Sequence, residues 1–161
     1  MHTSLATIAT LFAVSLALPG PLQDPATLHH QGMVMGFDQE ATTHHFYLYE
    51  DGGAIDVSVK DPADRENLAG IRQHLQMLPV HFGAGDFSMP EAVHEGTAVT
   101  GIEDLARLKD VITYRYAETD RGGRVNIVTT DAEALAAVHG YLRFQIGDHK
   151  TGDSTDVTIR K

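Results

Sequence analysis

The chain has 161 residues, of which 42% are hydrophobic and 21% are charged, a composition that suits one globular domain with an adequate core. Its formal net charge of −10 argues against nucleic acid and anionic membranes as partners and favours a cationic or neutral ligand. Cysteine is absent, which excludes disulfides, thiolate catalysis and cysteine-ligated metal centres, whereas histidine occurs 10 times.

The N-terminal region has the pattern of a secretory signal. The run from Leu5 to Leu18 is uncharged, apolar and too short to span a bilayer comfortably, and Ser15-Leu16-Ala17 offers a small-x-small cleavage site. We therefore expect residues 1–18 to be a signal peptide, residues 19–34 a flexible linker, and the mature protein to be periplasmic or secreted without membrane attachment. The alternative is an N-terminal helix that packs on the protein or anchors it.

A β-hairpin is predicted next, followed by a helix. Alternating residues from Thr42 to Glu50 form the first strand, Asp51-Gly52-Gly53 supplies a tight turn, and residues 54–60 form the second strand. Asp61 is the expected N-cap of the helix, with Pro62 in its first turn, and Pro79 is expected to bend the helix or to end its regular part. The apolar residues of this helix form one stripe: Leu68, Ile71, Leu75, Leu78 and Phe82.

The second half repeats this plan after an inter-repeat loop and a short helix through Ile102, Leu105 and Leu108. Strands are predicted over residues 111–118 and 124–130, and Asp131 caps a second long helix. Residues 71–86 align with residues 138–153 without a gap. The sequence thus predicts an α+β fold with a duplicated ββα unit, in which a four-stranded antiparallel sheet carries two long helices on one face. This single domain is expected over residues 35–154, with a C-terminal tail over residues 155–161.

Two adjacent histidines begin the first strand and must face opposite sides of the sheet. Phe46 and Leu48 mark the core side, so we expect His44 to face the helices. His45 then faces the open side. With Tyr47 and Tyr49, His45 forms a candidate surface for a homodimer or another protein partner, and an ordinary half-solvated face is the alternative.

Histidines from distant parts of the chain are the candidate metal ligands. No pair has the His-x₃-His or Glu-x-x-His spacing of a helical chelate, so a site requires convergence in space. The strand start, the inter-repeat loop and the second long helix can meet between the layers, with zinc or copper(II) as the expected ion. A haem would need the same convergence, with His44 and His139 as its ligands. The candidate metal ligands are His44, His94, His139 and His149.

The segment from Gly147 to Asp153 carries candidates for acid/base chemistry. His149 could pair with Asp148 or Asp153, since a carboxylate that orients an imidazole tunes it for proton transfer. The alternative is a glycine-rich helix end with solvated charges. The chain has no Gly-x-Ser-x-Gly elbow and no phosphate-binding glycine loop, so the sequence favours a binding protein over an enzyme. Four methionines could act as thioether ligands of copper(I) or could fill the core: Met33, Met35, Met77 and Met89.

Several runs, among them "MGFDQEATTHHF", "GDFSMP" and "LRFQIGDHKTGD", resemble an uncharacterised family of small secreted bacterial proteins. The resemblance covers about Met35 to Asp153 and implies secretion and a shared fold, but no chemistry. Some look-alikes carry an aspartate carbamoyltransferase label. This chain is too short for that enzyme and lacks its Ser-Thr-Arg-Thr loop.

These observations order three hypotheses. The first is a periplasmic or secreted protein that binds a transition metal or haem through histidines. The second is an interaction module without a cofactor that uses the His45, Tyr47 and Tyr49 face. The third is a small lyase or hydrolase with a His–Asp pair.

Overall fold

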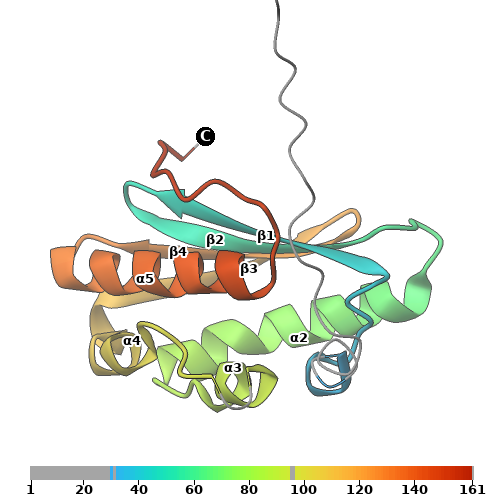
Figure 1. Cartoon of the computed structure of the whole chain (residues 1–161), viewed down its shortest axis with the longest axis horizontal. Helices are drawn as coiled ribbons and strands as arrows, with labels where there is room; N and C mark the ends of the chain where they lie inside the picture. The colour runs from blue at the N-terminus through green and yellow to red at the C-terminus, as the bar shows by residue number, and fades with distance from the viewer. Residues whose placement is uncertain (1–29, 31, 95–96, 161) are drawn as a thin grey trace, which may run out of the picture.

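The computed structural model describes residue 30, residues 32–94 and residues 97–160 (Figure 1). Within them, a four-stranded antiparallel sheet in the order β1-β2-β4-β3 carries the long helices on one face, as the sequence predicted. The elements are β1 (Thr42–Tyr49), β2 (Gly52–Val59), α2 (Arg65–Gly83), α3 (Ser88–Val93), α4 (Ile102–Arg107), η1 (Lys109–Val111), β3 (Ile112–Thr119), β4 (Gly122–Thr129) and α5 (Ala132–Asp148).

The two hairpins meet back to back at the centre of the sheet, where β2 pairs with β4. Gly52 has a φ of 141°, and a side chain on it would strike the carbonyl of Ile127. Gly122 is in the equivalent position against the carbonyl of Val57. The first glycine of each Gly-Gly pair is therefore required for the close approach of β2 and β4, and the duplication is visible as this reciprocal contact.

Each long helix covers mainly the hairpin of the other repeat. α2 packs on β3 and β4, whereas α5 packs on β1 and β2. The two repeats therefore share one core, and each hairpin is covered mainly by the long helix of the other repeat. The apolar stripe predicted for the first long helix lies at its centre, since Leu68, Ile71, Leu75, Leu78 and Phe82 are buried. Of the four residues that the apolar spacing predicts for the core side of the second long helix, Val138, Leu142 and Ile146 are buried and Leu135 is half-buried.

The helix ends differ in part from the prediction. Asp131 caps α5 as expected, its carboxylate accepting from the backbone N–H groups of Glu133 and Ala134. The N-cap of α2 is Asp64 rather than Asp61, because Asp61 forms a preceding turn in which its carboxylate accepts from the N–H of Ala63 at 2.8 Å. Pro79 does not end the helix, which continues to Gly83.

The ends of the chain lie partly outside the described residues, and the expected signal peptide over residues 1–18 lies wholly outside them. The expected linker over residues 19–34 is described only at residue 30 and residues 32–34, and these residues are helical. Beyond α5, the C-terminal segment runs along the sheet edge, where Thr158 forms a parallel bridge with Tyr49 of β1 (Figure 1). The inter-repeat loop contains a helix, α3, that the sequence did not predict.

Candidate functional site

A cavity of about 50 Å³ lies between the sheet and the helices, lined from β1, α2, the α3 region and the end of α5. Four imidazoles share it: His44, His74, His94 and His149. A volume of this size holds an ion or a few waters, since one water needs about 10–15 Å³ of such space. Sites for drug-sized ligands measure about 300–1,000 Å³, so the cavity does not fit a haem.

Three side chains at the end of α5 and α3 bring metal-ligating atoms together. His94, Asp148 and His149 each offer one such atom, and these atoms all lie within 4.8 Å of one another. His94 is the C-cap of α3 and His149 is the C-cap of α5, so two helix ends meet here. The predicted convergence of His94 with His149 is therefore present in the structure.

Both ring nitrogens of His94 have a partner on α5. Its Nδ1 lies 2.8 Å from Asp148 Oδ2, and its Nε2 lies 3.1 Å from Gln145 Oε1. The His94 side chain is only 2% exposed. Because Gln145 and Asp148 are three residues apart, they lie on one face of the helix. Their side chains form hydrogen bonds with opposite sides of the His94 ring.

His44 lies against this cluster from the sheet. Its ring stacks on His149 with centroids 5.2 Å apart and on Phe37 at 5.6 Å. The inward orientation predicted from Phe46 and Leu48 is confirmed, since both are buried and His44 lines the cavity. The Nε2 of His44 is buried and has no hydrogen-bond partner among the described residues.

Burial keeps these imidazoles neutral. Desolvation, with smaller contributions from His74 and His45, lowers the pKa of His44 to about 3. Desolvation also lowers the pKa of His149 to about 3, although the Asp148 carboxylate opposes the shift. Burial alone lowers the pKa of His74 to about 4. A neutral imidazole has a free nitrogen lone pair, which is the form that binds a metal.

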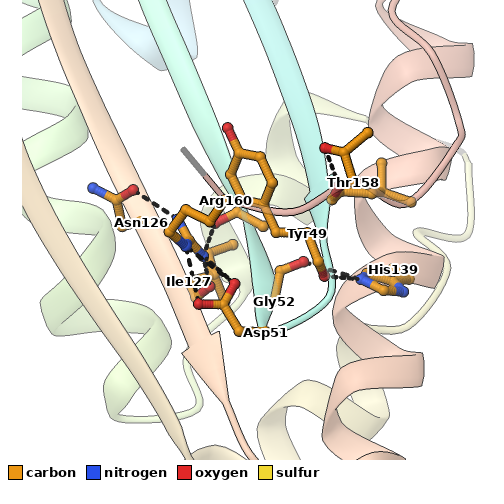
Figure 2. Close-up of polar contacts among 10 residues, drawn as sticks. Tyr49, Asp51, Gly52, Asn126, Ile127, His139, Thr158 and Arg160 are labelled. Carbon is orange, nitrogen blue, oxygen red and sulfur yellow. Dashed lines mark hydrogen bonds and ion pairs between the residues drawn. The ribbon is translucent and has the colours of Figure 1, made fainter.

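The structure does not bring His139 to the cavity. Its Nε2 lies 2.9 Å from the carbonyl oxygen of Tyr49 and 3.0 Å from that of Gly52 (Figure 2). These two carbonyls flank the β1–β2 turn, so the hydrogen bonds from the His139 N–H connect α5 to the first hairpin. His139 is thus structural, and the expected pairing of His44 with His139 around a cofactor is not formed.

The carboxylates proposed to pair with His149 are hydrogen-bonded to other histidines. Asp148 is bonded to His94, and Asp153 Oδ1 lies 2.9 Å from His45 Nδ1. The second oxygen of Asp153 accepts from the backbone N–H of Phe46 at 2.9 Å. Asp153 therefore ties the segment after α5 to β1 and fixes the position of the loop that carries His149.

Sequence reasoning missed two polar residues of the cavity, His74 and Gln145. Each lies next to the apolar stripe of its helix, His74 beside Leu75 and Gln145 beside Ile146, and each is buried. A buried polar residue within an apolar stripe is a recognisable signal for a site.

The open face of the sheet holds the aromatic residues that the sequence placed there. The rings of Tyr47 and Tyr49 stack with centroids 6.2 Å apart, and the Arg124 guanidinium lies 5.2 Å from the Tyr47 centroid. Arg160 of the C-terminal segment lies 4.4 Å from the Tyr49 centroid, so the chain itself covers part of this face. A homodimer through His45, Tyr47 and Tyr49 stays a prediction.

No family model, curated protein sequence or solved structure matches this chain. Within the described part of the chain, none of the helices has the length and apolar character needed to cross a membrane.

Proposed function

We propose that the protein is a small transition-metal-binding protein whose ion is held by His94, Asp148 and His149. The observation that carries the proposal is the convergence of three ligand atoms within 4.8 Å at the meeting point of two helix ends. Nitrogen and carboxylate ligands at that spacing need only small side-chain rotations to bind a common ion at about 2.0–2.2 Å.

The hydrogen bonds assign an atom to each ligand. The ion takes the place of the proton between His94 Nδ1 and Asp148 Oδ2, two atoms that are 2.8 Å apart. His149 Nδ1 lies 3.4 Å from Gln39 Oε1, so His149 binds through Nε2. Gln145 Oε1 then accepts from the Nε2–H of His94 and orients the ring, the usual outer-shell arrangement for a metal-bound histidine.

Two imidazoles and a carboxylate, with no sulfur, favour zinc or copper(II). The small cavity argues for an ion and against a haem. The net charge of −10 supports capture of a cation from solution. The proposal includes export of the protein, which is expected from residues 1–18. The protein purified from its native compartment should therefore begin near residue 18.

A metal titration of the full chain tests the proposal. After removal of metals with a chelator, calorimetry with zinc and with copper(II) should give one ion per chain. The variant His149→Ala should lose at least 100-fold in affinity, as expected for loss of one of three ligands.

His81→Ala is the matched control, because His81 also pairs with a carboxylate, Asp86 at 2.7 Å, but lies on the surface at 39% exposure. This variant should bind like the wild type. Absence of stoichiometric binding, or equal loss in the two variants, would refute the proposal.

A further inference from the structure

We propose that two copies of the chain associate through the outer edge of β3, so that their four-stranded sheets join into one continuous antiparallel sheet. The proposal goes beyond the metal site and does not depend on it. It also differs from the dimer predicted through His45, Tyr47 and Tyr49, because those residues belong to β1, at the opposite edge of the sheet.

The chain covers the β1 edge with its own C-terminal segment. Thr158 donates its backbone N–H to the carbonyl of Leu48 and accepts from the N–H of Glu50, each at 3.0 Å. The next outward N–H of β1, that of Phe46, donates to the Asp153 carboxylate at 2.9 Å. Proteins commonly protect edge strands in this way, because exposed N–H and C=O groups pair with other chains. The β1 edge is therefore closed to a second copy.

The outer edge of β3 has no such cover. Thr129 of β4 donates its N–H to Asp51 on the β2 side, so its neighbour Val128 and every second residue before it turn towards β3. The residues of β3 between these pairs have N–H and C=O groups that point outward: Tyr114, Tyr116 and Glu118. Among residues 30, 32–94 and 97–160, these backbone groups have no hydrogen-bond partner. Neither a proline nor a bulge interrupts the strand, so the whole edge can pair.

The charge of this edge favours a second copy as the partner. The segment from Lys109 to Arg121 holds three basic and three acidic residues, so it is neutral in a chain whose net charge is −10. Two copies therefore repel each other less here than at an average part of their surface.

The charged side chains also select a register. Only residues with outward groups can form hydrogen-bonded pairs, and a two-fold axis at Tyr116 pairs Tyr114 with Glu118 of the other copy. Arg115, which is exposed, then lies opposite the exposed Ala117 of the other copy. An axis at Arg115 would instead place two arginines directly opposite each other, and like charges in that position destabilise a sheet. The axis is therefore expected at Tyr116.

The helical layer fits this arrangement. α2 packs on both β3 and β4, and because strands lie about 4.8 Å apart, joining two β3 edges places the two α2 axes about 10 Å apart, a usual packing distance. Arg72 marks the side of α2 nearest the edge, since it pairs with Glu118 at 3.0 Å. Gln76, Pro79 and Gly83 continue this side at helical spacing, and none of them is buried. The interface thus combines strand pairing with helix packing.

Sedimentation velocity of the full chain over a range of concentrations tests the proposal, with excess chelator present so that a metal ion cannot link the copies. The wild type should show a monomer–dimer equilibrium. Glu118→Pro should weaken dimerisation by roughly 100-fold or more, because proline lacks the outward N–H and its ring blocks the edge. Glu118→Ala is the matched control, since it loses the same carboxylate and keeps the N–H, and it should dimerise like the wild type. Circular dichroism checks that both variants fold.

Ala117 gives a second test that leaves the backbone unchanged. In the proposed register it faces Arg115 of the other copy, so Ala117→Glu should tighten the dimer and Ala117→Arg should weaken it. Each change should be about fivefold, because the pair occurs twice in the dimer. Adding Arg115→Glu to Ala117→Arg should restore the affinity, since opposite charges then face each other again.

A monomer at all concentrations, or a dimer of normal affinity in Glu118→Pro, would overturn the proposal. Equal affinities in Ala117→Glu and Ala117→Arg would overturn the pairing of the two β3 strands about Tyr116. A dimer that is lost in Tyr47→Ser and kept in Glu118→Pro would place the interface on the open face of the sheet instead.

Discussion

The Nδ1 of His94 and the Oδ2 of Asp148 lie 2.8 Å apart although 54 residues separate them in the chain. His94 comes from the segment between the repeats, and Asp148 is the last residue of α5. The inter-repeat segment therefore does more than connect two ββα units, because it completes a site at the end of the second helix.

Binding of zinc should stabilise the fold, because the ion joins α3 to the end of α5. At a free zinc concentration 100 times the dissociation constant, the gain is about 2.7 kcal/mol, which for a domain of this size raises Tm by roughly 5–10 °C. Differential scanning fluorimetry with zinc, and then with excess chelator, measures the gain and its reversal. His149→Ala should show less than a third of the shift, and an equal shift in this variant would place the bound zinc elsewhere.

His139→Ala should lower stability without changing metal affinity. The substitution leaves the carbonyls of Tyr49 and Gly52 without their donor and removes a buried ring, so we expect a loss of about 2–3 kcal/mol in the free energy of unfolding. Urea denaturation followed by circular dichroism provides the value. A normal free energy of unfolding combined with lost zinc binding would contradict the role assigned to His139.

The fold was predictable from the sequence because its signals are local. The Gly-Gly turns, the alternation of Phe46 and Leu48 and the cap at Asp131 depend on neighbouring residues and on the side-chain period of two in a strand. The same period correctly placed His44 inside. The crossed packing of α2 on the second hairpin was not predicted, since it follows from the shape of the whole core.

The candidate site was predictable only in part because its ligands come from separate elements. His44, His94 and His149 meet at the cavity, but His139 lies ten residues before His149, too far along α5 to reach it. Asp148 was expected to pair with His149, and in the structure it forms a hydrogen bond with His94. The number of histidines suggested metal binding, which stays a prediction, and the tertiary contacts decide which histidines lie together.

Arg160→Ala should destabilise the first hairpin. The Arg160 guanidinium stacks on Tyr49, pairs with Asp51 and donates to the carbonyl oxygen of Ile127 at 2.9 Å (Figure 2). It is 24% exposed, so we expect a loss of about 1–2 kcal/mol in the free energy of unfolding. Arg160→Lys should recover less than half of this loss, because an ammonium cannot form the planar stack and the forked contacts.

The control for this prediction is Arg115→Ala on the exposed side of β3, which should change the free energy of unfolding by less than about 0.5 kcal/mol. Hydrogen exchange of the β1 and β2 amides gives a second measurement, since loss of the Arg160 contacts should speed exchange at the hairpin end. Unchanged exchange and stability in Arg160→Ala would show that the Arg160 side chain contributes nothing to the stability of the sheet.

The metal-free protein should lose stability as the pH falls below about 6.5. Burial lowers the pKa of His74 from 6.5 to about 4. Between these two pH values, the unfolded chain binds a proton at His74 and the folded chain does not. The stabilisation from this group is complete above pH 6.5 and is lost as the pH falls towards 4, at up to about 1.4 kcal/mol per pH unit. His44 acts in the same direction, since its pKa is lowered to about 3.

Urea denaturation of the chelator-treated protein at pH 7, 6 and 5 measures this slope, and His74→Leu should reduce it by up to about 1 kcal/mol per pH unit. A stability that stays level over this range in the wild type would mean that the folded protein binds protons at His74 as readily as the unfolded chain does.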